Sequence, residues 1–221
     1  KLVEDRFGHL AKVRAHDTET ARFLGGETRV EKGLEQAHVA LAFEAPGYRA
    51  DDVYVAQVYA MALGGGMSSR LFQEAREKRG LCYTIFAQAS AYADSGMLTI
   101  YAGTGGEDLE GLLSLTVEEM RRTTDDMSAA EIDRARAQMK AGMLMGLESP
   151  ASRAERMARQ LAIWDRIPSL EETVERIDAV TVDKTRNYAC QLAAGGNAAL
   201  ALYGPVGTAP AIEQMTGRLA A

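Results

Sequence analysis

Apolar and polar residues alternate in four stretches of the chain, and this period of two predicts β-strands. Residues 36–43 are largely apolar on both faces, which indicates a strand inside a sheet. Residues 83–90 and 97–102 flank the turn sequence DSG at 94–96, so they predict an antiparallel hairpin. Residues 198–203 form a short apolar stretch before Gly204 and predict one more strand.

Apolar residues spaced three and four positions apart predict helices through most of the remaining chain. Capping residues mark several helix starts, because their side chains can accept hydrogen bonds from the free N–H groups of the first turn. Pro150, directly after Ser149, suits a first turn because its fixed φ fits a helix and the N–H that it lacks would have no helical partner there. The expected helices cover residues 2–15, 51–63, 68–79, 107–122, 128–147 and 149–164, one that starts at Ser169, and 181–192. Two of them begin with a predicted capping box, Ser128 with Glu131 and Ser169 with Glu172.

These elements predict an α+β protein with about four strands and with most helices after the hairpin. The 221 residues are 47% apolar and 25% charged, which is ordinary for a globular protein. We find no linker or repeat, so we expect a single domain over residues 1–221. No apolar run approaches the ~20 residues of a membrane span, and we expect a soluble protein without a membrane partner.

The net charge and the positions of the cysteines and histidines argue against several classes of function. The net charge of −6 argues against a nucleic-acid partner, which would need a basic surface. Cys82 and Cys190 are too few and too far apart for a disulfide framework. His9, His16 and His38 include no pair four residues apart, so we expect no zinc site in this chain.

The first residue is Lys rather than Met, and no signal peptide follows it, so we expect a segment of a longer chain. A cytoplasmic location is the default expectation, and a periplasmic one stays open.

Residues 63–86, LGGGMSSRLFQEAREKRGLCYTIF, concentrate the unusual features of the sequence. Three glycines before a helix start could cradle a phosphate, yet no Lys-Ser/Thr pair follows at the required spacing and a helix precedes the glycines. Nucleotide binding is therefore disfavoured. From the pattern alone, the simplest interpretation is a helix end, a tight turn and a solvated run of charges that ends at Gly80 in a left-handed conformation.

The same block resembles the C-terminal half of the pitrilysin-type zinc metallopeptidases, the family of insulin-degrading enzyme and mitochondrial processing peptidase. The similarity is closest to the short bacterial members. It extends upstream to EQAHVALAF and downstream through DSGMLTIYAGT, MKAGMLMGLESPASRAERMARQL and the terminal LALYGPV, so it covers nearly the whole chain.

The resemblance implies a fold and a partner. It implies a largely antiparallel sheet with helices packed on one side, forming one half of a clamshell with two homologous halves around a closed chamber. In that family the N-terminal half carries the H-x-x-E-H zinc motif. This sequence lacks the motif, so the resemblance implies the non-zinc half, with zinc and its ligands in an N-terminal half on the same or a separate chain.

The resemblance also implies site residues. A basic residue and a tyrosine of the family's second half bind the substrate backbone, and the matching positions are Arg76 and Tyr83. Tyr83 would donate a hydrogen bond to the substrate carbonyl or to the oxyanion formed from it. Gly64, Gly65 and Gly66 would form a flexible approach that lets backbone come close to the peptide. The competing interpretation is that Tyr83 shares a face with Ile85 in the core and that Arg76 is only a surface cation at a helix end.

Other residues have simpler interpretations. We expect His38 to be a packed or hydrogen-bonded histidine, and Cys82 to be a buried thiol on the opposite strand face from Tyr83. Met139, Met143, Met145 and Leu147 fit a helix face against the sheet. Trp164 fits either the core or a domain interface.

The function expected from these observations is the substrate-binding, chamber-completing half of a zinc metalloendopeptidase, inactive alone. Its partners would be the zinc-bearing half, a peptide substrate and possibly a second copy in a dimer. The alternative is a non-catalytic subunit of the same family that serves in assembly or substrate capture.

Overall fold

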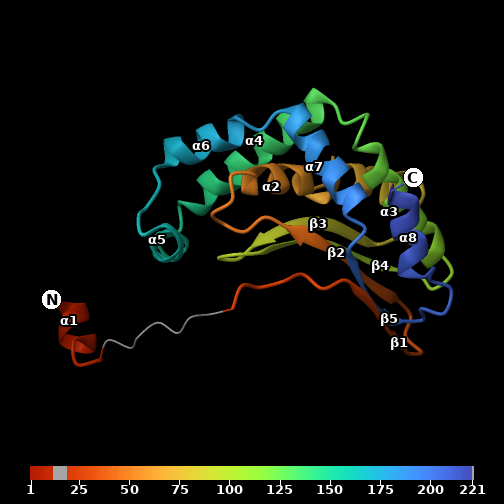
Figure 1. Ribbon diagram of the computed structural model, residues 1–221, viewed down its shortest axis with the longest axis horizontal. Coiled ribbons are helices and arrows are strands. Elements are labelled where there is room, and N and C mark those ends of the chain that lie inside the picture. Colours follow the sequence, from red (N-terminus) through yellow and green to blue (C-terminus); the bar gives the residue numbers. More distant parts are fainter. Residues whose placement is uncertain (12–18, 221) are drawn as a thin grey trace.

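Five strands form one sheet in the order β1-β5-β2-β4-β3 (Figure 1). The structure is a computed structural model that describes residues 1–11 and 19–220. β1 pairs with β5 in parallel, and the other neighbouring pairs are antiparallel. The strands are β1 (Gly26–Glu31), β2 (Ala37–Ala45), β3 (Thr84–Ala91), β4 (Gly96–Thr104) and β5 (Ala198–Gly204).

The helices gather on one face of this sheet. Figure 1 shows α2, α4, α6 and α7 above the strands, with α3 and α8 at one end and α5 at the other. The opposite face of the sheet carries no helix in the described part of the chain. The helices are α1 (Leu2–Phe7), α2 (Val53–Gly64), η1 (Phe72–Lys78), α3 (Leu109–Arg122), α4 (Ala129–Gly146), α5 (Pro150–Trp164), α6 (Leu170–Asp178), α7 (Val182–Gly195) and α8 (Ile212–Ala220).

The core lies between the sheet and the first helical layer. Val39, Leu41 and Phe43 of β2 point toward the helices and are buried. α2 is buried on nearly all sides because it packs on β3 below and against α4 and α7. This arrangement confirms the expected α+β fold, with a largely antiparallel sheet and helices on one side.

The expected elements form, with differences at their ends. Ser128 and Glu131 make the reciprocal capping box of α4, and Ser149 caps α5 through its hydroxyl. Ser169 caps α6, but Glu172 pairs with Arg166 instead of completing a second box. Helix α1 ends at Phe7, and residues 12–15 of the expected N-terminal helix lie outside the described residues, as does His16.

The sequence pattern missed β1 and α8. β1 is exposed along its whole length, so it lacks the alternation of a half-buried strand. Its polar side chains form hydrogen bonds with the C-terminal segment. Glu27 accepts from the Ile212 N–H at 2.9 Å, and Arg29 donates to the Ala209 and Pro210 carbonyls at 2.7 Å. The two missed elements therefore hold each other in place.

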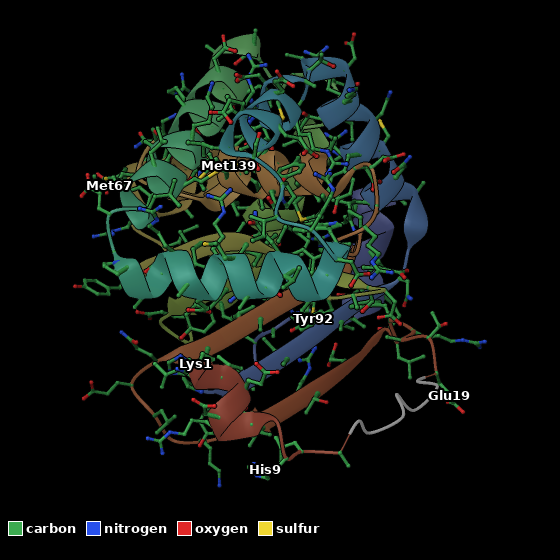
Figure 2. The ribbon with its side chains drawn as sticks, turned by 90° about the vertical axis from the view of Figure 1, so that its left-hand side faces the viewer. Lys1, His9, Glu19, Met67, Tyr92 and Met139 are labelled. Atoms are coloured by element: carbon green, nitrogen blue, oxygen red, sulfur yellow. The ribbon has the colours of Figure 1, made fainter. Side chains whose placement is uncertain are left out.

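The methionine-rich end of α4 does not pack on the sheet, so that expectation is wrong. α4 lies in the outer layer on α2. Met139 is only partly buried and Met145 is 65% exposed. Figure 2 shows Met139 among the helices, well away from the strands. Trp164 is half-buried and packs edge-on against Tyr48, with ring centres 6.0 Å apart.

Helix α1 lies apart from the body of the molecule, below α5 in Figure 2, where Lys1 and His9 are labelled. Leu2, Val3 and Phe7 are all more than half exposed. Among the described residues, no helix combines the length and the apolar character needed to span a membrane.

Candidate functional site

The structure brings Arg76 and Tyr83 into contact. Arg76 lies on η1, and Tyr83 directly precedes β3, an edge strand of the sheet. The guanidinium carbon of Arg76 is 5.4 Å from the centre of the Tyr83 ring and 4.7 Å from that of Phe72. The arginine is thus held between two aromatic rings by cation–π contacts. Phe72 is a site residue that sequence reasoning missed, although its position one helical turn before Arg76 is a usable signal.

Tyr83 is on the surface rather than in the core. It is 75% exposed, whereas Cys82 and Ile85 on either side are buried. The interpretation of Tyr83 as a core aromatic is therefore wrong. Among the described residues, no protein group hydrogen-bonds the Tyr83 hydroxyl or the Arg76 guanidinium, and the closest carboxylate to Arg76 is that of Glu77, 3.9 Å away. Both side chains are free to bind a ligand.

Local backbone geometry explains why the two side chains meet. η1 is a π-helix, in which each N–H donates to a carbonyl five residues back and the turn is wider than in an α-helix. Gly80 has φ +65° and reverses the chain. The Gly80 N–H donates to Arg76 O at 3.2 Å, and the Leu81 N–H donates to Ala75 O at 2.8 Å. Tyr83 is then tied to β4, because its N–H donates to Gly103 O at 3.2 Å.

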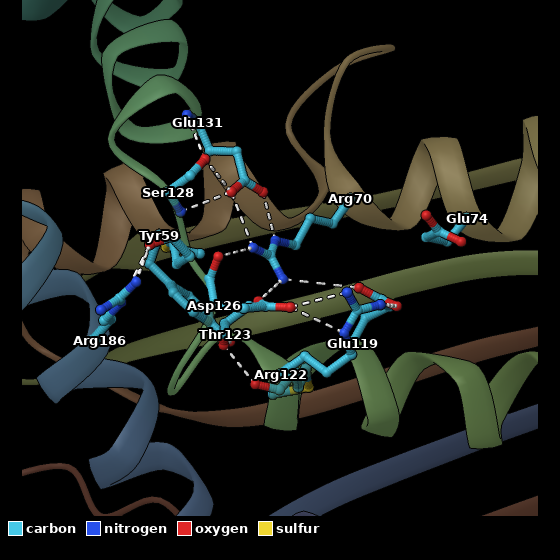
Figure 3. Close-up of polar contacts among 12 residues, drawn as sticks. Tyr59, Arg70, Glu74, Glu119, Arg122, Thr123, Asp126, Ser128, Glu131 and Arg186 are labelled. Atoms are coloured by element: carbon cyan, nitrogen blue, oxygen red, sulfur yellow. Dashed lines mark hydrogen bonds and ion pairs between the residues drawn. The ribbon is translucent and has the colours of Figure 1, made fainter.

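Arg70 lies six residues before Arg76, just ahead of η1. Unlike Arg76, it is buried among carboxylates (Figure 3). The Arg70 side chain is 10% exposed and donates to both carboxylate oxygens of Glu131, at 2.5 and 2.9 Å. It also pairs with Asp126 and lies 4.0 Å from Glu119. Arg122 bridges Glu119 and Asp126 from the other side. Sequence analysis missed this ion network because its members come from four separate elements or loops.

Burial and the ion network together shift the pKa values of Glu131 and Glu119 in opposite directions. Burial opposes ionisation of Glu131, but hydrogen bonds from Arg70 and Ser128 outweigh it and lower the pKa of Glu131 to about 2. Burial raises the pKa of Glu119 above its ordinary value, and the nearby Arg122 and Arg70 only partly offset this. Glu131 is therefore the acid that anchors Arg70 as a stable ion pair.

The three glycines have a packing reason of their own. A Cβ at Gly64 would lie 2.5 Å from Ala87 N, and one at Gly66 would lie 2.7 Å from the Gln138 amide. At Gly65 it would meet Met61. The turn therefore needs small residues to let α2 end against β3 and α4. Contact with a peptide at these glycines stays a prediction.

Cys82 and His38 are not placed as catalytic groups. Burial raises the pKa of the Cys82 thiol, so it is not an activated nucleophile. His38 lies on β2, where its Nδ1 is 2.8 Å from the Tyr101 hydroxyl. No three His, Cys, Asp or Glu side chains in residues 1–11 and 19–220 are arranged to hold a metal ion. The described residues thus do not fit the zinc ion that the resemblance implies for the family.

Comparison with known proteins gives a family and a fold. A family profile described as "Peptidase M16 inactive domain" matches residues 1–139. The uncharacterized zinc protease YmxG of Bacillus subtilis is 36% identical over 213 residues, which are 95% of this chain and 52% of that protein. The uncharacterized zinc protease Mb2805c of Mycobacterium bovis is 34% identical over 220 residues, 96% of this chain and 50% of that protein.

A solved structure, "Complex III2 from Candida albicans, Inz-5 bound", contains a chain with the same fold. Its TM-score is 0.86 at 19% identity, over 95% of this chain and 53% of that chain. The present chain thus spans about half the length of the curated relatives and of the solved chain that it matches.

Proposed function

This chain belongs to the M16 peptidase family, where it matches the inactive domain, and we propose that it is the substrate-binding half of a zinc endopeptidase. In this proposal a second, zinc-bearing half completes a chamber around the peptide and carries out the hydrolysis. The present half has no catalytic activity alone. Its relatives at 34–36% identity are described as zinc proteases, which supports a peptidase rather than an assembly subunit.

The observation that carries the proposal is the exposed Arg76–Tyr83 pair. Arg70 is taken up by carboxylates and Tyr59 by Thr123, whereas Arg76 and Tyr83 lie against each other at the surface with unused donors. The Arg76 guanidinium can hold a carboxylate with two parallel N–H donors, or donate to a backbone carbonyl. Phe72 restricts the Arg76 side chain, so less rotamer entropy is lost when a peptide binds.

Tyr83 has the chemistry to assist the reaction at the peptide carbonyl. Its hydroxyl donates a hydrogen bond to the carbonyl oxygen, and this bond strengthens as negative charge develops on that oxygen. The proton stays on the tyrosine oxygen throughout. Arg76 holds the neighbouring peptide unit, and both groups therefore act on substrate that is bound between the two halves. The glycine turn at residues 64–66 is included in the proposal as an approach for the peptide backbone.

The test uses this half together with its zinc-bearing partner half, on the same or a separate chain, and we call this complete enzyme the full-length protein. We expect Tyr83→Phe to lower kcat/KM about 100-fold, the usual scale for losing one donor to an oxyanion, and Arg76→Ala to lower it about 10-fold. Tyr92→Phe and Arg79→Ala are matched controls, because both side chains are exposed and lie outside the pair. If both test variants keep kcat/KM within a factor of ~2 of the parent, the assignment is wrong.

Removal of zinc separates the roles of the two halves. We expect a chelator to abolish peptide cleavage by the full-length protein. The same chelator should leave the thermal unfolding midpoint of the present chain unchanged, because its described residues hold no metal cluster. Zinc that stays bound stoichiometrically to the 221-residue chain after chelation and dialysis would contradict the proposal.

A further inference from the structure

A groove in the helical layer has the features of a small-molecule site and contains neither Arg76 nor Tyr83. It lies among α2, α4, α5 and α6 and has a volume of about 380 Å³. Sites for small molecules are typically concave, ~300–1,000 Å³ in volume and mostly apolar, with a few polar groups that orient the ligand. We call this site the four-helix groove, and the residues that carry its chemistry are Tyr54, Met139, Met143, Arg156, Gln160 and Ile177.

Apolar side chains form much of the groove. Tyr54 lies on α2, Met139 and Met143 lie on α4, and Ile177 lies on α6. Figure 2 labels Met139 in this part of the helical layer. Methionine side chains are flexible and polarizable, so they adapt to apolar ligands and make favourable contacts with aromatic rings. Two methionines of α4 that do not reach the sheet therefore line a groove instead.

One polar side chain of the groove is buried without a partner. Gln160 of α5 is 8% exposed, and its amide makes no hydrogen bond within the described part of the chain. Among the described residues, only the Tyr188 hydroxyl is both fully enclosed and unpartnered. The Gln160 amide is therefore not sealed in the core, and its accessible atoms face the groove that the residue lines. A buried amide without a partner costs free energy, which a ligand that bonds to it recovers.

A half-buried arginine one turn before Gln160 has no carboxylate partner. Arg156 lines the groove and donates one long hydrogen bond, 3.5 Å, to Thr173 Oγ1. It forms no ion pair within the described residues, whereas Arg159 of the same helix pairs with Glu155. A guanidinium has five N–H donors, so most of those of Arg156 are available to an anion.

The charge of the groove selects the sign of the ligand. Arg156 is the only charged side chain among the described residues that line it. The other polar groups are neutral, namely the amides of Gln57, Gln138 and Gln160 and the hydroxyl of Thr173. A carboxylate can accept two parallel hydrogen bonds from a guanidinium, and such charge-assisted bonds are stronger than neutral ones. A neutral or cationic ligand would leave the guanidinium without an anionic partner.

We propose that the four-helix groove binds a small organic acid that joins an apolar or aromatic group to a carboxylate. Arg156 and the Gln160 amide donate to the carboxylate, and the apolar group lies against Tyr54, Met139 and Met143. A free acid and the C-terminal residue of a peptide share this chemistry. The inference goes beyond the proposed function and does not depend on it, because the groove contains no residue of the candidate site.

The test uses the full-length protein with zinc removed and hydrocinnamate as the probe. Binding is followed through the methyl NMR signals of isotope-labelled methionine, because Met139 and Met143 line the groove, whereas Met145 is 65% exposed and lies outside it. Hydrocinnamyl alcohol has the same apolar group without the charge. A short peptide that ends in Phe, with a free or an amidated C-terminus, separates a peptide terminus from a free acid.

Two variants change the charge and the space of the groove. Arg156→Met removes the charge and keeps a long side chain, and Arg159→Met is its control on the same helix. Gly142→Leu fills the groove, because Gly142 lines it and nothing lies within 4 Å of an added Cβ. Gly146→Leu is the matched control, since it has the same open space on α4 and does not line the groove. Leu also favours a helix over Gly, so lost binding would not come from unfolding.

We expect hydrocinnamate to shift the signals of Met139 and Met143 saturably and to leave that of Met145 unchanged. Arg156→Met should raise the dissociation constant of the acid about 10-fold or more, the scale of a charge-assisted hydrogen bond, and make acid and alcohol bind alike. Gly142→Leu should weaken both by about 10-fold or more, and both controls should stay within a factor of ~2 of the parent. If the free-terminus peptide binds more tightly than hydrocinnamate and amidation abolishes this, the ligand is a peptide terminus; weaker binding of both peptides indicates a free acid.

Several results would overturn the inference. One is the absence of saturable shifts at Met139 and Met143 with hydrocinnamate, and another is equal affinity of the parent for acid and alcohol. Unchanged binding in Gly142→Leu would place the acid elsewhere. Loss of binding in Arg76→Ala would place it at the candidate site. None of these results bears on the effect of Arg76→Ala and Tyr83→Phe on kcat/KM, so the proposed function is tested separately.

Discussion

Arg70 and Arg76 lie six residues apart in one segment, and their surroundings are opposite. Arg70 is 10% exposed and is surrounded by Glu131, Asp126 and Glu119, so its donors are taken up by the protein. Arg76 is 38% exposed, is held between two aromatic rings and donates to no protein acceptor in the described residues. One arginine fixes the segment to α3 and α4, and the other is presented at the surface.

Residues 70–83 are fixed to the protein at one end and expose two side chains at the other. Ion pairs of Arg70 join the start of the segment to Glu119 near the C-terminal end of α3 and to Glu131 in the N-terminal cap of α4 (Figure 3). The wide turn of η1 and the reversal at Gly80 then carry Arg76 and Tyr83 to the edge of the sheet. The predictions below separate the anchoring part from the presented part, beginning with the largest expected effect.

Removing each arginine should have very different effects on folding. We expect Arg70→Met to lower the free energy of unfolding by about 3 kcal/mol, because it leaves partly buried carboxylates without their cation. Arg76→Met should lower it by less than about 0.5 kcal/mol, the scale of an exposed cation–π contact. Urea denaturation of both variants at pH 7 measures the difference. Equal losses would show that the two arginines do not divide the roles in this way.

The anchor should also depend on pH in a definite direction. The pKa of Glu131 falls from 4.5 to about 2 on folding, so its contribution is fully present above pH ~4.5 and is lost as the pH falls toward 2. Glu131→Gln should destabilise the protein by about 2 kcal/mol at pH 7, and by less than half of that at pH 3. Urea denaturation of parent and variant at both pH values checks this. If the parent and the variant differ in free energy of unfolding by the same amount at both pH values, the charge of the Glu131 carboxylate does not stabilise its ion pair with Arg70.

Gly80 connects the anchored and presented parts, and a Cβ there should be costly. At φ +65° we expect Gly80→Ala to lower the free energy of unfolding by about 1–1.5 kcal/mol. Gly142→Ala is the matched control in mid-helix, where nothing meets the added Cβ, and it should stabilise by about 0.5–1 kcal/mol. Thermal unfolding of the two variants gives opposite shifts in Tm. A neutral Gly80→Ala would show that the reversal tolerates other backbone angles.

Like Arg70 and Arg76, Tyr59 and Tyr83 should differ in how much they contribute to the free energy of unfolding. Tyr59 is fully buried and shares a 3.1 Å hydrogen bond with Thr123 Oγ1, so Tyr59→Phe should cost about 1 kcal/mol. Tyr83→Phe should change the free energy of unfolding by less than about 0.3 kcal/mol, because its exposed hydroxyl has no described protein partner. Chemical denaturation compares them. A cost at Tyr83 equal to that at Tyr59 would indicate a structural role for the Tyr83 hydroxyl.

Much of the fold could be predicted because its signals are local. The Ser128–Glu131 box needs only a spacing of three residues, and the hairpin of β3 and β4 needs only alternation on both sides of a turn. The left-handed Gly80 follows a run of basic residues at a helix end, which is also a local pattern. Arg76 and Tyr83 could be selected only through the family resemblance, because the residue pattern alone favoured a core tyrosine and a surface cation.

The remaining features depend on residues that are distant in sequence. The carboxylates that hold Arg70 lie 56 and 61 positions away, and β1 pairs with β5 from the other end of the chain. The exposure of Tyr83 follows from its place at a sheet edge beside η1, not from its alternation with Ile85. The sequence by itself determined most of the elements, several of their caps and the absence of the family's zinc motif, since these depend on neighbouring residues. Tertiary structure decided which arginine is buried and which is presented, because burial and charge pairing depend on segments that meet only after folding.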